Sequence, residues 1–222
     1  MKKIVSLLLV LVLAVAVLAS CQSVDVSAFD ECYARSYPHV ITVETEQVFG
    51  NKSLVSEKTL QRGYVGEDFF AKETYVGQEF RSIEDGSGVN VYEPIADINT
   101  VRWYRENMGV SEDKGKTWDS AAASFFPAKG GFALNLDTSV MEDVVIDGNT
   151  LTFTVAASNT KTVFGEDTTI ASDVDITVKT DGAVVTNCIV EYVVPAADSG
   201  VDEVSVKVSA TYIYSQQEIS LD

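Results

Sequence analysis

The sequence has few of the residues that most catalytic sites require. It contains one histidine, His39, and three cysteines, so a histidine-rich zinc site is excluded and a hydrolytic triad would depend on His39 alone. Cys32 could pair with His39 as nucleophile and base, but it lies in a segment with the composition of a tether. No G-x-S-x-G motif supplies a serine instead. We therefore expect a protein that is not an enzyme, with no catalytic residue and no cofactor.

Positive charge is also scarce. Lys and Arg together number 16 against 33 Asp and Glu, which gives a formal net charge of −17. Removal of an N-terminal segment that carries Lys2 and Lys3 would leave about −19. No basic run or strip of aromatic and Arg residues is present. Because nucleic-acid binding depends on such basic surfaces, we expect no nucleic-acid partner.

Motifs for phosphate and calcium are absent as well. Gly86-Ser87-Gly88 lacks the following glycine, lysine and helix of a nucleotide-binding loop. No stretch matches the D-x-[DN]-x-[DN]-G pattern of a calcium loop, and the acidic pairs stand beside expected turns. We expect solvated loop charge and no metal site, with a weak calcium site as the alternative. These acidic residues are Glu142, Asp143, Glu166, Asp167, Asp173, Asp175, Asp202 and Glu203.

The N-terminus has the three parts of an export signal. Met1-Lys2-Lys3 precedes an apolar run, Ile4 to Val17, and the small residues Ala19-Ser20 lead to Cys21. The run is shorter than the roughly 20 residues that a membrane-spanning helix requires. Leu18-Ala19-Ser20-Cys21 resembles the lipobox of bacterial lipoproteins, which implies cleavage before Cys21 and lipidation of that cysteine. We expect an extracytoplasmic protein whose partner is the membrane that holds its lipid anchor.

The domain organisation follows from this reading. Residues 1–20 would be the lipoprotein signal peptide, 21–36 a lipidated tether and 37–222 a single β-rich domain, which should fold without the tether. Cys32 and Cys188 could form a disulfide in an exported protein, or remain two separate thiols. The spacing fits neither a metal site nor a C-x-x-C pair.

From His39 onward, the pattern is typical of antiparallel strands. Apolar and polar residues alternate with period two, and β-branched residues are frequent. Glycine-containing turns separate these stretches, and a short helix is expected around Ser120 to Phe126, before Pro127. Strands are expected at 39–49, 54–65, 69–83, 100–105, 144–146, 151–155, 174–179, 184–194 and 204–214.

The order of these features resembles the lipid-binding half-barrel superfamily that includes the LolA and LolB lipoprotein carriers and the LppX-like lipoproteins. The shared features are the lipobox, the long strands of 58–80, Trp103-Tyr104, the step at 115–118 and the closing hairpins at Asp147-Gly148 and Asp181-Gly182. The resemblance implies a mainly β fold, in which a strongly curved antiparallel sheet with a few short covering helices surrounds an apolar cavity for acyl chains.

Two functions are favoured over a third, an extracytoplasmic hydrolase, which is the weakest because the chain has so few acid–base candidates. The first is a non-catalytic protein that binds or carries a hydrophobic ligand such as a lipid or acyl chain, between the inward face of 54–80 and the segment 118–126. The second is a surface interaction protein with a packed β-core and a protein or cell-envelope partner. The candidate ligand-binding residues are aromatic: Tyr64, Phe70, Tyr75, Phe80, Trp103, Trp118, Phe125 and Phe126.

Overall fold

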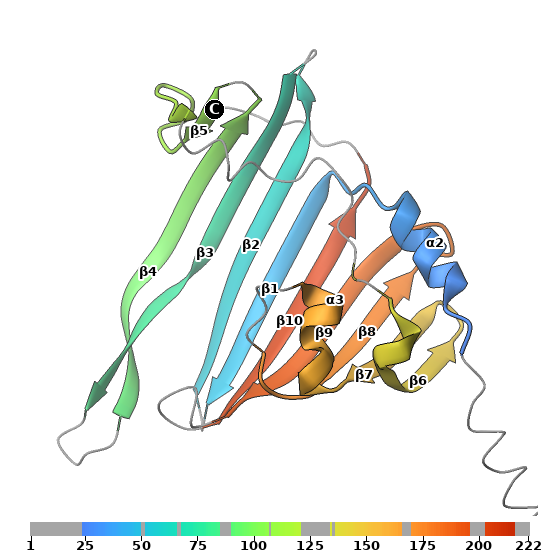
Figure 1. The fold of residues 1–222 in the computed structure, drawn as a ribbon. Helices are drawn as coiled ribbons and strands as arrows, with labels where there is room; N and C mark the ends of the chain where they lie inside the picture. The colour runs from blue at the N-terminus through green and yellow to red at the C-terminus, as the bar shows by residue number, and fades with distance from the viewer. Residues whose placement is uncertain are drawn as a thin grey trace, which may run out of the picture.

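A computed structural model describes residues 24–49, 52–65, 68–84, 90–106, 108–120, 134, 136–165, 170–195 and 203–215. The predicted signal peptide, Cys21 and most of the short helix expected around Ser120 to Phe126 lie outside these residues. Within them the fold is mainly β, as the sequence predicts: one antiparallel sheet of ten strands with two short α-helices (Figure 1). None of the described helices is long and apolar enough to cross a membrane.

The sheet consists of two meanders that meet in its middle. The first runs outward from β1 to β5 and the second runs inward from β6 to β10, so that β1 pairs with β10. The strands are β1 (Val40–Phe49), β2 (Lys52–Val65), β3 (Asp68–Glu84), β4 (Asn90–Arg105), β5 (Gly109–Ser111), β6 (Met141–Asp147), β7 (Thr150–Val155), β8 (Val174–Thr180), β9 (Val185–Val194) and β10 (Val204–Ile213).

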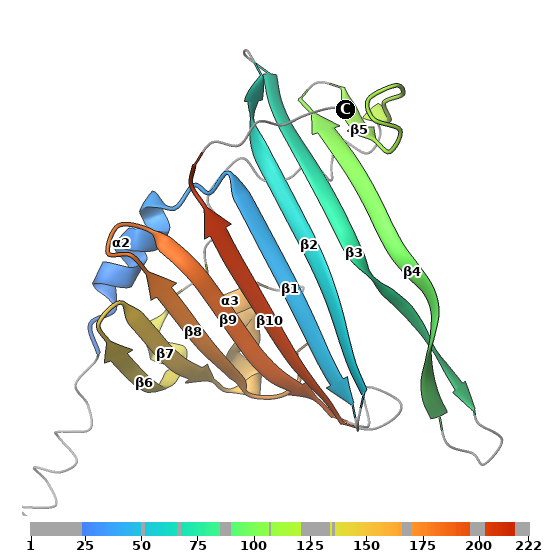
Figure 2. The same cartoon turned by 180° about the vertical axis from the view of Figure 1, so that it is seen from behind.

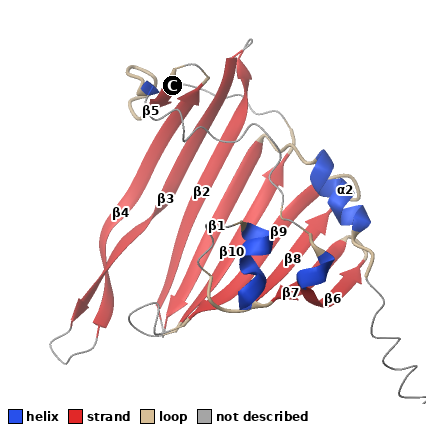
Figure 3. Cartoon of the chain, in the orientation of Figure 1, coloured by secondary structure: helices blue, strands red, loops and turns tan. Residues whose placement is uncertain are grey.

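Short helical segments lie on one face of the sheet, over the half that contains β6 to β10 (Figures 1 and 3). Seen from behind, α3 lies beyond the strands (Figure 2). We call this side the helix-bearing face and the other the opposite face. The segments are the α-helices α2 (Ser27–Arg35) and α3 (Thr160–Phe164) and the 3-10 turns η2 (Thr138–Val140) and η3 (Ala157–Asn159).

The main core fills the space between the helices and the sheet. Strand β7 shows why: Leu151, Phe153 and Val155 are buried, whereas the threonines between them are only half-buried. Alternation of this kind places every second side chain on the covered face. Residues of α2 and α3 join the same cluster, so both short helices are held by apolar burial.

The α2 helix lies within the segment that the sequence analysis assigned to the tether. Phe29, Cys32 and Tyr33 on one side of the helix are buried. Ser36 fixes its end, because the hydroxyl donates to the Cys32 carbonyl at 2.8 Å and accepts from the Val185 amide at 3.0 Å. Part of the expected tether is thus packed against β9.

Candidate functional site

The predicted aromatic residues are divided between the two faces of the sheet. In an antiparallel pair, residues directly opposite each other share a face. Tyr64 is opposite Phe69, and Tyr75 lies on the same face as Phe69, which is the helix-bearing side. Phe70 and Trp103 lie on the opposite face, because Phe70 pairs with Gly63 and Trp103 pairs with Lys72.

Their environments differ as well. Phe70 and Trp103 are each 4 % exposed and lie beside cations: the guanidinium of Arg105 is 5.0 Å from the Phe70 ring, and the ammonium of Lys72 is 5.7 Å from that of Trp103. Tyr64 is 52 % exposed, and its ring meets that of Phe69 edge to face. The structure therefore brings Tyr64 near Phe69 and does not bring the whole set to one surface.

Four of the predicted residues lie wholly or partly outside the described part of the chain. Cys21, Phe125 and Phe126 lie outside the described residues, as does the side chain of Phe80. Trp118 is placed, in a turn after β5, where its indole N–H donates to the Gly115 carbonyl at 3.0 Å. It contributes to the turn and is partly buried there.

The helix-bearing face is apolar across much of its width. The main core covers β7 to β10 and reaches Ile41 on β1. A smaller cluster around Val204 and Val206 lies at one end of β10, and a third contains Phe69, Ala71 and Tyr104 on β3 and β4. The buried residues of these three clusters are each at most 8 % exposed.

Half-buried apolar residues connect the three clusters. Leu60 packs against both the main core and the cluster on β3 and β4. Tyr192 packs against both the main core and the cluster at Val206. Val43 and Val190 are likewise only partly buried against the main core. The apolar surface is thus continuous from β7 to β4 but incompletely buried in the middle of the sheet.

This central strip was not predicted from the sequence. The predicted site comprised the strands of 54–80 and the segment 118–126, whereas Val43, Val190 and Tyr192 belong to β1 and β9. The signal in the sequence was the period-two pattern of those strands, which identifies an apolar face. The pattern does not show which strands become neighbours. In the structure, β10 lies between β1 and β9.

Charged groups lie directly beside this strip on the helix-bearing face, because Lys58 is opposite Val43 and Glu73 is opposite Leu60. The Lys58 ammonium on β2 lies 2.8 Å from the Glu73 carboxylate on β3, and Arg102 on β4 donates to Glu112 at 2.8 Å. An open hollow of about 480 Å³ lies beside β4 and β5. Its lining is Arg102, Tyr104, Val110, Ser111, Glu112, Thr117 and Asp119. The surface over β2 to β5 is thus mixed in polarity.

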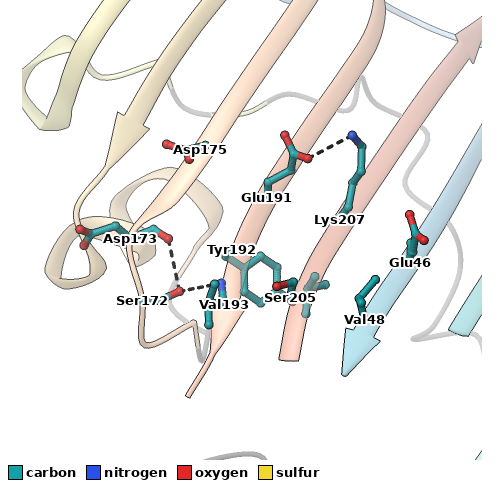
Figure 4. A pocket seen from close by; sticks show the side chains of 11 residues that line it. Glu46, Val48, Ser172, Asp173, Asp175, Glu191, Tyr192, Val193, Ser205 and Lys207 are labelled. Carbon is teal, nitrogen blue, oxygen red and sulfur yellow. Dashed lines mark hydrogen bonds and ion pairs between the residues drawn. The ribbon is translucent and has the colours of Figure 1, made fainter. Parts of the chain in front are cut away.

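A second open hollow, of about 530 Å³, lies at the ends of β1, β8, β9 and β10 (Figure 4). The Lys207 ammonium pairs with the Glu191 carboxylate at 3.0 Å, and the Ser172 hydroxyl accepts from the Val193 amide at 3.1 Å. Its lining also contains Glu46, Asp173 and Asp175. Within the described part of the chain, no three acidic, His or Cys side chains converge as metal ligands.

The cysteines and the histidine lie in different surroundings. Cys32 and Cys188 are both buried in the main core and are free thiols. Burial raises the pKa of the Cys188 thiol to about 11, so it remains protonated at neutral pH. His39 precedes β1, and its imidazole lies against the Arg62 carbonyl, 3.3 Å from Nδ1. No hydrogen bond in the described structure joins His39 to Cys32.

Fold and surface together define a class: an antiparallel β protein with short helices on one face and a half-buried apolar strip beside them. No protein-family model matches the chain, and no curated protein shows significant similarity to it.

Proposed function

We propose that the protein is an extracytoplasmic lipoprotein, anchored through lipid on Cys21, which binds an apolar ligand such as an acyl chain on its helix-bearing face. In this proposal the sheet curls around the ligand as a half-barrel, and no covalent chemistry takes place. The observation that supports it is the continuous apolar strip through Leu60, Val43, Val190 and Tyr192, which is only half-buried in the described structure.

Burial of this strip by a ligand would be favourable. Apolar surface gains about 25 cal/mol for each Å² removed from water, so covering the exposed parts of these four side chains would contribute to ligand binding. The short helices α2 and α3 cover only the half of the face formed by β6 to β10. An acyl chain along the strip would lie beside them, in contact with β1, β2, β9 and β10.

Uptake of a fluorescent fatty acid by the unlipidated chain from Gln22 tests this proposal. Leu60→Lys should lower the affinity at least tenfold, because a charged side chain would enter the apolar strip. Thr59→Lys is the matched control, since Thr59 is the adjacent residue on the opposite face and is also half-buried. Its affinity should remain within twofold of the parent.

Two results would contradict the proposal: no uptake by the parent chain, or equal losses in both variants. The alternative is a surface interaction protein with a protein or cell-envelope partner. It is supported by three exposed valines on the opposite face, Val48, Val55 and Val76, which are 38 %, 53 % and 46 % exposed on neighbouring strands.

A further inference from the structure

The outer edge of β4 is regular and has no partner strand among the described residues over 96–102. Beyond that stretch, β5 pairs with β4 at Trp103, Tyr104 and Arg105. Figures 1 and 2 show β4 at the border of the sheet, with β5 beside one end only. An unpaired edge presents amide and carbonyl groups that can pair with another chain.

The backbone direction along this edge follows from the neighbouring bonds. The Glu106 amide donates to the Phe69 carbonyl on the β3 side, at 2.9 Å. N–H and C=O directions alternate along a strand, and the register between β3 and β4 is unbroken from Asp97 to Arg105. Asp97, Asn99 and Val101 therefore direct their backbone groups outward, away from β3.

Proteins normally protect such edges, and the other border of this sheet is protected. Strand β6 has a register shift between Glu142 and Val145, and Asp143 within it has a φ of 51°. Bulges of this kind disrupt pairing with a further strand. The stretch 96–102 contains no bulge, no proline and no lysine, and Ile98, Thr100 and Val101 favour strands.

We propose that this edge pairs with the same edge of a second copy, as an antiparallel two-fold pair of β4 strands centred on Asn99. If the sheet continues across a two-fold axis, each residue of one copy must lie opposite a residue of the second copy that belongs to the same face of the sheet. Pairing centred on Asn99 meets this condition. Residue 96 is then opposite 102 of the partner, 97 opposite 101 and 98 opposite 100, so the whole free stretch is used.

The two ends of the free stretch fit this arrangement. At one end is β5, beside Trp103. At the other end is a bulge, where Glu79 pairs with Ala96 but Phe80 pairs with Pro94, so that Ile95 is left over. In the pair, the bulge of each copy meets Ser111, the last residue of β5, of the other. A bulge bends and twists the strand that carries it, so regular pairing between the copies ends at this point.

The charges permit the same pairing, although the whole chain carries −17. The only charged residues in the free stretch are Asp97 and Arg102, so it is locally neutral. In the proposed pair Asp97 is opposite Val101 and Arg102 is opposite Ala96, and no like charges face each other. Three hydrogen-bonded residue pairs form, each of which exchanges two backbone bonds.

Thiol crosslinking of the full chain in membranes of the producing cell tests the pair. At a hydrogen-bonded pair on the axis, two copies of residue 99 have Cα atoms about 5.5 Å apart. Asn99→Cys should therefore give a covalent dimer with a short bismaleimide, at least fivefold above the parent chain. Thr211→Cys is the control, because Thr211 is also exposed on the opposite face but lies on the interior strand β10. It should crosslink no more than the parent.

A second comparison separates edge pairing from random collision. Val101→Pro added to Asn99→Cys removes an outward amide and should abolish the dimer, whereas Val101→Ala in the same background should retain it. Equal thermal stability of these two double variants would show that the β3–β4 pairing is intact. The proposal is overturned if Asn99→Cys gives no dimer above the parent, if Thr211→Cys crosslinks equally, or if equally stable proline and alanine variants give the same yield. If the proline variant is less stable, the Asn99→Cys and Thr211→Cys comparison alone decides.

Discussion

Asp113 organises the turn that follows β5. Its carboxylate accepts from the Ser111 hydroxyl at 2.8 Å, from the Thr117 amide at 2.8 Å and from the Thr117 hydroxyl at 2.6 Å. The Ser111 hydroxyl in turn accepts from the Gly115 amide at 2.8 Å. Gly115 has a φ of 75° and lies against the Trp118 ring, where a side chain would be strained. The acidic residue thus has a structural role in this turn.

These hydrogen bonds predict a pH-dependent turn. They lower the pKa of Asp113 to about 2, with the Thr117 hydroxyl as the largest cause, because each donor favours the ionised carboxylate. The stabilising contribution is therefore complete above the unfolded pKa of about 3.9 and is lost as the pH falls through about 2. We expect the NMR titration of the Asp113 carboxyl carbon to have its midpoint near 2. A midpoint near 3.9 would contradict the hydrogen bonds described for this turn.

At the scale of elements, α2 contributes to the core although it precedes the first strand by several residues. Phe29 and Tyr33 are each 5 % exposed and belong to the main apolar cluster. Arg35 donates from Nε to the Ala183 carbonyl at 3.1 Å, in the turn between β8 and β9. The helix has only nine residues, which is too short to be stable alone, so its packing on the sheet maintains it.

Removal of the Phe29 side chain should therefore destabilise the whole domain. Phe29→Ala should lower the free energy of unfolding by about 3 to 5 kcal/mol, since it leaves a cavity in a close-packed cluster. Urea denaturation followed by circular dichroism measures this. Glu31→Ala is the control on the exposed side of α2 and should change stability by less than about 0.5 kcal/mol. If Phe29→Ala lowers the free energy of unfolding by less than about 1 kcal/mol, α2 is dispensable for the stability of the domain, as a tether would be.

At the scale of the whole molecule, the proposed protein has a lipid anchor and a β domain whose helices and main apolar core lie on one face of the sheet. The resemblance to a lipobox at Leu18-Ala19-Ser20-Cys21 supports the anchor. Only five residues separate Cys21 from the start of α2 at Ser27, so such an anchor would hold the domain close to the bilayer surface. The acidic surface would keep it from adhering to anionic headgroups.

Replacement of the cysteine tests the anchor directly. Cys21→Ser should abolish incorporation of a clickable palmitate analogue, because the serine hydroxyl cannot form the thioether that carries the lipid. We expect the protein to be found either unprocessed or released from the membrane fraction. Cys32→Ser is the matched control, since that thiol is buried in the core, and it should remain labelled. Equal labelling of the Cys21→Ser variant and the parent would exclude lipidation at this residue.

The sequence by itself determined the mainly β class and most of the strands. Alternation in β7 and β10 has a local cause, because successive side chains point to opposite faces of a strand. The sequence also predicted both closing hairpins from the turns at Gly148 and Gly182. These glycines have positive φ values of 56° and 88°. The sequence did not determine that Phe70 and Trp103 lie on the face opposite Tyr64. Register and alternation determine this only once the strand pairing is known.

Only the tertiary structure decided which apolar residues form one surface. The neighbours β1 and β10 are more than 150 residues apart in the chain, and no local pattern contains that pairing. The same pairing makes Leu60 and Tyr192 parts of a single strip and leaves β4 at the border of the sheet. The role of α2 also depends on long-range contact, since its short, mixed sequence acquires a helical structure through burial against strands that follow it by more than 100 residues.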